Sequence, residues 1–208
     1  MKVKGLFLKE VYAQKTSLII WSIAFVAFFA AAIISDKTWH MMIFYCLMTS
    51  MAGLNSMSLD ERGWGKYAYG LPCSSKEIIL SKYIFDFVWR FGTLFLLIIG
   101  RIIGSFIFDF EFLSGNCAFG LTLAFLFYTV VYFLFPMYFK WGNKASVALC
   151  AMIGFAVGIT VNILGFNDKL SVNMMGVVPV IISLCVLLVS IPVTYHITVK
   201  LYEKQELD

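Results

Sequence analysis

Long apolar runs are the feature that most constrains the fold of this chain. A helix that crosses the hydrocarbon core of a bilayer needs about 20 residues, at about 1.5 Å of rise each. The 208-residue sequence has six stretches of that length, at residues 16–35, 38–59, 83–108, 112–139, 145–167 and 170–199. Only 13% of the residues are charged, against about 25% in a soluble domain. We therefore predict an all-α integral membrane protein whose residues 1–208 form a single domain of six transmembrane helices.

The distribution of lysine and arginine predicts how these helices are oriented. Short cytosolic loops carry an excess of basic residues. One side of the predicted bundle receives Lys2, Lys4, Lys9, Lys15, Arg62, Lys66, Lys76, Lys82, Lys140, Lys144, Lys200 and Lys204. The other side receives only Lys37 and Lys169. Both the N- and the C-terminus are therefore expected in the cytosol. Because the basic residues lie in small groups between apolar runs, no groove for nucleic acid is expected.

The N-terminal segment, residues 1–15, is predicted to be an interfacial helix. Val3, Phe7 and Val11 recur at the spacing of one helix face, and the lysines fall on other faces. Such a pattern is typical of a helix that lies in the membrane interface. The alternative is a basic leader that only sets the topology.

Residues 60–82 form the one long polar loop, between the second and third predicted spans. Ser74 and Glu77 fit the capping box S-x-x-E, in which each residue satisfies an amide of the other. Pro72 restrains Leu71 to an extended conformation just before it. A helix is therefore expected to begin beside Ser74 and to lead into the third span. Taken alone, this pattern also fits a simple connector.

Three charged residues lie inside the third predicted span. Asp86 and Arg90 are four residues apart and can pair on one helix face. We predict a structural ion pair or a snorkelling arginine there, with the lining of a substrate entrance as the alternative. Arg101 lies deeper, where a charge costs about 2.5–3.5 kcal/mol on insertion scales. It either snorkels toward the outer surface or faces a polar interior and contacts substrate.

Two pairs of glycines have the G-x-x-x-G spacing that lets membrane helices approach closely. They are Gly100 with Gly104 in the third predicted span, and Gly154 with Gly158 in the fifth. About one such pair arises by chance among 15 glycines in 208 residues, so helix packing at these positions is a hypothesis.

The sequence carries no catalytic or metal-binding pattern. It has no G-x-x-x-x-G-K-[ST] phosphate loop, so any ATP hydrolysis must come from a separate polypeptide. His40 and His196 have no H-E-x-x-H context, and the five cysteines form no C-x-x-C pair. An intramembrane enzyme needs convergent Glu, His or Asp residues in its spans, which are lacking here. We expect no enzymatic activity, no metal site and no directly bound cofactor.

Two stretches resemble the ABC-2-type transporter permeases, in particular the small group that includes the phenol-soluble-modulin exporter permeases. The leader KGLFLKE at residues 4–10 is similar to their K-G-L-x-L-K-[ED] leader, and residues 60–83 are similar to their loop between spans two and three. The resemblance implies that this loop is a coupling helix that docks on a cytosolic ATPase, which binds ATP and Mg²⁺. The implied docking residues are Asp60, Glu61, Arg62, Trp64, Lys66, Tyr67, Leu71, Pro72, Ser74, Ser75, Lys76 and Glu77.

The expected function is therefore one half of an ATP-driven exporter in a bacterial plasma membrane. A second permease, identical or related, is the implied partner, with the fifth span facing it. With 21 phenylalanines and 10 methionines, the surfaces favour adaptable binding of amphipathic or hydrophobic substrates, with peptides such as antimicrobial peptides as the expected class. Arg90 and Arg101 are the candidate residues of a substrate path. The alternative function is an accessory or immunity protein that binds a toxic peptide without transporting it.

Overall fold

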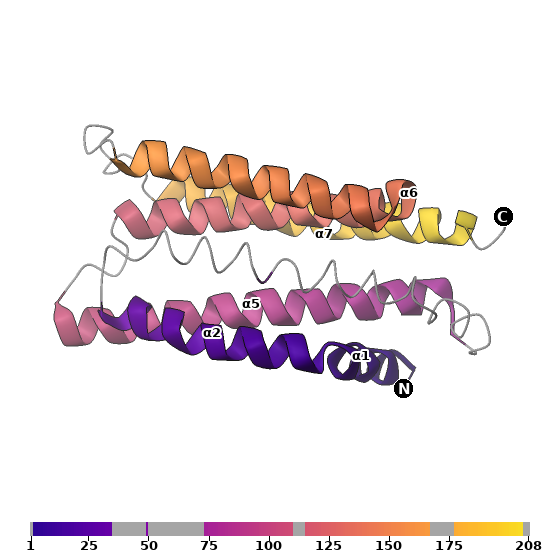
Figure 1. Cartoon of the computed structure of the whole chain (residues 1–208), viewed down its shortest axis with the longest axis horizontal. Coiled ribbons are helices and arrows are strands. Elements are labelled where there is room, and N and C mark those ends of the chain that lie inside the picture. The colour runs from indigo at the N-terminus through magenta and orange to yellow at the C-terminus, as the bar shows by residue number, and fades with distance from the viewer. Residues whose placement is uncertain (1, 35–48, 50–72, 110–114, 167–176, 206–208) are drawn as a thin grey trace.

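The computed structural model describes residues 2–34, 49, 73–109, 115–166 and 177–205, and this part of the chain is helical, without strands (Figure 1). Its helices are α1 (Lys2–Ala13), α2 (Lys15–Ile34), α5 (Ser75–Phe108), α6 (Gly115–Phe166) and α7 (Val177–Gln205). The predicted all-α class is confirmed for these residues.

Three of the described helices are long and apolar enough to cross a membrane. They are Ser75–Phe108, Cys117–Gly142 and Val177–Lys204. The bent pair Val3–Ala13 and Lys15–Ala30 counts as a fourth if it forms one span. The second predicted span, 38–59, lies outside the described residues except for Thr49, and the number of six spans stays a prediction.

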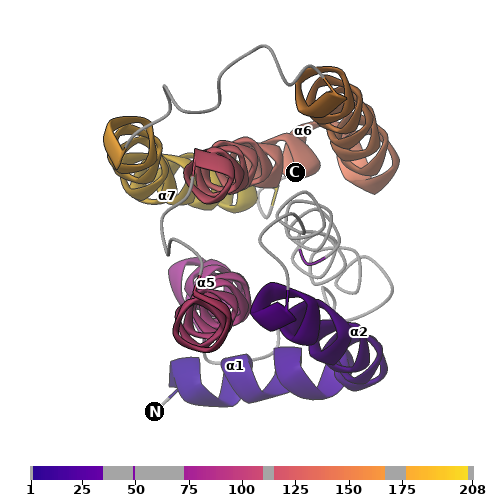
Figure 2. The same ribbon diagram turned by 90° about the vertical axis from the view of Figure 1, so that its left-hand side faces the viewer.

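The long helices run side by side, and α1 crosses one end of them (Figures 1 and 2). The axis of α1 turns by 70° into that of α2. A helix is therefore present over the segment predicted to be interfacial, and it is steeply inclined to α2. Whether this helix lies in the membrane interface stays a prediction.

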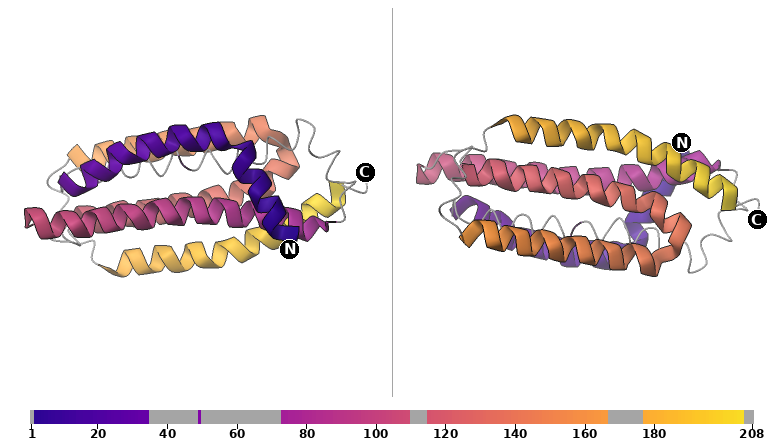
Figure 3. Two further views of the ribbon diagram at one scale, coloured as in Figure 1. Left: turned by 90° about the horizontal axis from the view of Figure 1, so that it is seen from below. Right: turned by 90° about the horizontal axis from the view of Figure 1, so that it is seen from above.

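A single glycine divides α6 into two limbs. Gly142 has φ 81° and ψ 173°, and the chain turns back there (Figure 3). Glycine adopts positive φ without the steric cost that a Cβ imposes. The turn falls between the fourth and fifth predicted spans, where the sequence places Lys140 and Trp141.

One end of the bundle holds α1, the first turn of α5, the turn at Gly142 and the last turns of α7 (Figures 1 and 3). The two ends of the described chain thus lie at the same end of the bundle, as an even number of crossings requires. Cytosolic termini agree with this arrangement but stay a prediction.

The distribution of side chains is inverted relative to a soluble protein. The largest fully buried side chains include Arg90, Arg101 and Lys82, whereas Phe106 is 84% and Ile23 69% exposed. The core itself is aromatic and aliphatic, drawn mainly from α5, α6 and α7. An apolar exterior is stable in lipid and unstable in water.

Candidate functional site

The start of α5 is built by the predicted capping box, which is confirmed. Ser74 is extended, with φ −78° and ψ 152°. The Glu77 amide donates to Ser74 Oγ at 3.4 Å, and the Ser74 amide donates to Glu77 Oε2 at 2.9 Å. Because two backbone donors are satisfied reciprocally, the first turn is fixed. Ser74 and Lys76 are exposed there, so this turn is accessible from outside the bundle.

Most of the predicted docking residues lie outside the described part of the chain. They are Asp60, Glu61, Arg62, Trp64, Lys66, Tyr67, Leu71 and Pro72. The structure therefore describes four of the predicted docking residues, namely Ser74, Ser75, Lys76 and Glu77, all at the start of α5.

A buried ion pair joins the beginning of α5 to α1. Lys82 Nζ lies 3.2 Å from Glu10 Oε1, and both side chains are 2% exposed. Lys9 Nζ lies 2.8 Å from the same oxygen. Phe7 and Phe85 add a tilted ring contact with centroids 6.2 Å apart. The first turns of α5 and the crossing helix are therefore held together by charge as well as by apolar packing.

Polar contacts also join the beginning of α5 to the end of α7. The hydroxyl oxygens of Tyr83 and Thr198 lie 2.9 Å apart in the core. The Tyr195 hydroxyl donates to the Lys76 carbonyl at 3.3 Å. The rings of Tyr83 and Tyr195 meet edge to face, with centroids 5.6 Å apart. Sequence reasoning did not identify any of these contacts, because the partners lie more than 100 residues apart.

The predicted pair of Asp86 and Arg90 is present and buried. Arg90 Nε donates to Asp86 Oδ1 at 2.8 Å, and Nη2 lies 2.7 Å from the same oxygen. The Arg90 guanidinium also lies 5.3 Å from the ring centroids of both Tyr128 and Tyr132 on α6. The arginine is fully buried and does not snorkel to the surface. Its long side chain instead connects α5 with α6.

The deeper arginine, Arg101, is also fully buried. Its side chain therefore faces the interior of the bundle, in line with the second of the two alternatives. Asp109, at the end of α5, is exposed and in the left-handed conformation with φ 58°. Whether Arg101 contacts a substrate stays a proposal.

Among the four glycines of the two predicted pairs, the structure shows a close contact at Gly100. A Cβ placed on Gly100 would lie 2.9 Å from Phe29 Cε2 on α2. Gly104 is buried on the same helix. Gly154 and Gly158 lie in the second limb of α6, and their packing is outside the described part. The close approach of α5 and α2 therefore depends on the missing side chain of Gly100.

No group of three or more His, Cys, Asp or Glu able to hold a metal ion occurs among the described residues. The polar groups described above instead serve to connect α5 with α1, α6 and α7. These charged and polar side chains therefore link neighbouring helices inside the bundle.

Comparison with known families gives one finding. A family model described as "ABC-2 family transporter protein" matches residues 5–203, nearly the whole chain and every described helix. Curated proteins and solved structures give no match.

Proposed function

The chain belongs to the ABC-2 family of transporter proteins and thus to the membrane permeases of ABC transporters, and from this premise we propose that it is one half of an exporter of amphipathic or hydrophobic substrates, with peptides as the expected class. The family implies an ATPase partner and a surrounding bilayer. In our proposal the ATPase is a separate polypeptide that docks at the start of α5, and the permease lies in a bacterial plasma membrane with a second permease beside it.

The capped start of α5 is the observation that carries this proposal. The turn is exposed, has a fixed backbone, and carries one lysine and one glutamate. An ATPase surface can recognise such a rigid element without first ordering it, which lowers the cost of association. The same turn continues without a break into a helix of 34 residues, or about 51 Å at 1.5 Å per residue.

The contacts of α5 explain how docking there moves the bundle. Lys82 ties α5 to Glu10 of α1, and Tyr83 ties it to Thr198 of α7. Both contacts lie within the first nine residues after the cap, so a push on the cap acts on three helices together. Farther along, Arg90 contacts the tyrosines of α6. In the proposed mechanism, closure of the ATPases tilts α5 and carries α1 and α7 with it.

The proposed substrate path uses the buried arginines. Arg90 and Arg101 lie on the inner face of α5 and are fully buried. A path that places such buried arginines beside aromatic walls suits a substrate that is amphipathic or hydrophobic. The fifth predicted span, with Gly154 and Gly158, is the proposed contact with the second permease.

The proposal is tested by measuring how strongly the permease stimulates ATP hydrolysis by its ATPase and how well it transports. The permease is reconstituted with its ATPase, and the double variant Lys76→Gln/Glu77→Gln is compared with wild type. Gln at position 77 keeps the capping box, so the helix start is preserved while both charges are removed. We expect permease-dependent stimulation of ATP hydrolysis and transport to fall at least about tenfold, with the basal ATPase rate unchanged.

A matched control removes the same two charge types elsewhere. Lys200 and Glu203 are exposed near the end of α7, and Lys200→Gln/Glu203→Gln should leave stimulation unchanged. Wild-type transport by the first double variant would defeat the docking assignment. An ATPase that neither binds the permease nor responds to it would instead favour the accessory or immunity function.

A further inference from the structure

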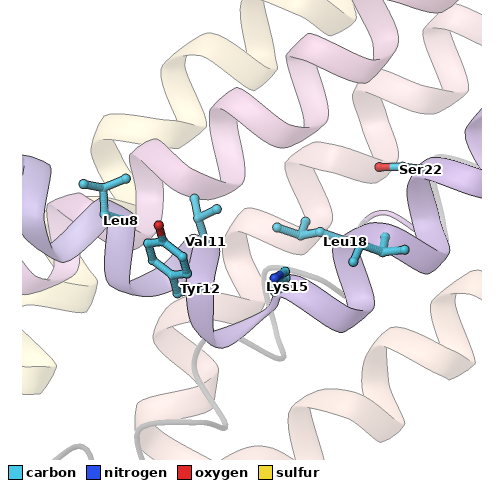
Figure 4. Close-up of a pocket in the computed structure, with 7 residues that line it drawn as sticks. Leu8, Val11, Tyr12, Lys15, Leu18 and Ser22 are labelled. Carbon is cyan, nitrogen blue, oxygen red and sulfur yellow. The ribbon is translucent and has the colours of Figure 1, made fainter.

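The bend between α1 and α2 encloses a groove on the outside of the bundle (Figure 4). The two helices meet at 70°, and the groove lies on both sides of their junction. Its lining residues are Leu8, Val11, Tyr12, Lys15, Leu18, Ile19 and Ser22. The groove is therefore apolar along both helices, with a lysine at the corner.

The lining is open to the surroundings of the protein and not to its core. Leu8 is 44%, Ile19 50% and Tyr12 73% exposed. The apolar side chains continue from α1 into the first turns of α2, whose sequence is mostly apolar after Ser17. In a membrane protein such a surface meets acyl chains at the level where a span leaves the interface.

The charge of the groove is positive. Lys15 is exposed, and no carboxylate lines the groove among the residues described. Glu10, the only acidic residue before Asp36 in the sequence, points instead toward Lys82 of α5. Lys9, its neighbour on α1, contacts the same carboxylate oxygen. The buried ion pair therefore leaves the charge of Lys15 without a competing carboxylate in the groove.

We propose that this groove binds one anionic phospholipid of the leaflet that faces the α1 end of the bundle. The phosphate group lies beside Lys15, and an acyl chain lies over Leu8, Leu18 and Ile19. Tyr12 supplies an aromatic ring and a hydroxyl at the level of the headgroup, where such residues are favoured. The site is independent of the transported substrate and of the ATPase.

The test uses the delipidated, detergent-purified full chain and native mass spectrometry. The probes are phosphatidylglycerol, which is anionic, and phosphatidylcholine, which has no net charge. Wild type is expected to bind the anionic lipid more tightly. Lys15→Gln should weaken its binding about five-fold, which corresponds to the contribution of one lysine beside an anionic headgroup, and should leave phosphatidylcholine unchanged.

Two further variants separate this groove from general surface charge. Lys4 is exposed on α1 but does not line the groove, so Lys4→Gln should leave the preference intact. Ser22→Trp fills the groove from its exposed side and should weaken the binding of both lipids. An equal effect of the two lysine variants would overturn the proposal, as would unchanged lipid binding by Ser22→Trp. If the wild-type chain binds a second copy and the Ser22→Trp variant does not, the groove is a dimer contact and the lipid proposal is wrong.

Discussion

The buried pair of Asp86 and Arg90 provides the sharpest test of how α5 is built. Both Nε and Nη2 of Arg90 lie within 2.8 Å of Asp86 Oδ1, and the two side chains are 0% and 1% exposed. The variant Arg90→Met removes the cation and leaves the carboxylate in the interior. Breaking a buried pair in this way costs about 3–5 kcal/mol of unfolding free energy. Asp86→Leu should cost a similar amount, since it leaves the guanidinium buried.

The double variant Asp86→Leu/Arg90→Met should recover most of this loss. Apolar residues of similar volume often replace a buried pair with little change in stability. The contacts of the guanidinium with Tyr128 and Tyr132 are lost, which costs about 2 kcal/mol at desolvated sites. We therefore expect the double variant within about 2 kcal/mol of wild type, far less than the combined cost of the two single variants.

The assay is equilibrium unfolding of the purified chain in mixed detergent micelles, followed by circular dichroism. Lys200→Met serves as the control, because that lysine is exposed and its loss should shift stability by less than about 0.5 kcal/mol. Single-variant costs that simply add in the double variant would refute the reasoning, since independent charges give no coupling.

The same variants address function. A double variant that is stable and still transports assigns Asp86 and Arg90 to structure alone. A double variant that is stable but inactive places Arg90 in the substrate path.

Two further predictions concern helix contacts and use the same unfolding assay. Gly100→Ala should lower the free energy of unfolding by about 1–3 kcal/mol, because its Cβ meets Phe29 at 2.9 Å. Gly92→Ala, with open space around it, should raise that free energy by up to about 1 kcal/mol. Equal shifts for the two variants would contradict close packing of α5 on α2. Glu10→Gln should lower the free energy of unfolding by about 3 kcal/mol, because it removes the carboxylate that neutralises buried Lys82. Adding Lys82→Met should restore most of this loss. A double variant as unstable as Glu10→Gln alone would contradict the pairing.

Features set by one helix turn could be predicted from the sequence. The capping box of Ser74 and Glu77 spans three residues, and the pair of Asp86 and Arg90 spans four. At these separations the helix itself determines which side chains meet. The turn near Gly142 was likewise expected from the charged break between two apolar runs. Local geometry thus accounts for the predictions that the structure confirmed.

Contacts between helices could not be predicted in this way. Glu10 and Lys82 lie 72 residues apart, and Tyr83 and Thr198 lie 115 apart. In a soluble helix the apolar stripe shows which face is buried. On α5 both faces are rich in apolar residues, because one of them meets lipid. The direction of Arg101, for example, became clear only from its burial.

The positions of these contacts along α5 favour a lever over a local switch. Near the cap, Lys82 and Tyr83 attach α1 and α7. About two turns later, Arg90 attaches α6, and beyond it Gly100 packs on α2. A helix held by a different neighbour at each level cannot unwind locally without breaking a buried contact, so a load applied at its capped end is relieved most cheaply by tilting the whole helix. In the proposed mechanism, the charged and tyrosine side chains inside the bundle are the couplings through which that tilt reaches the other helices.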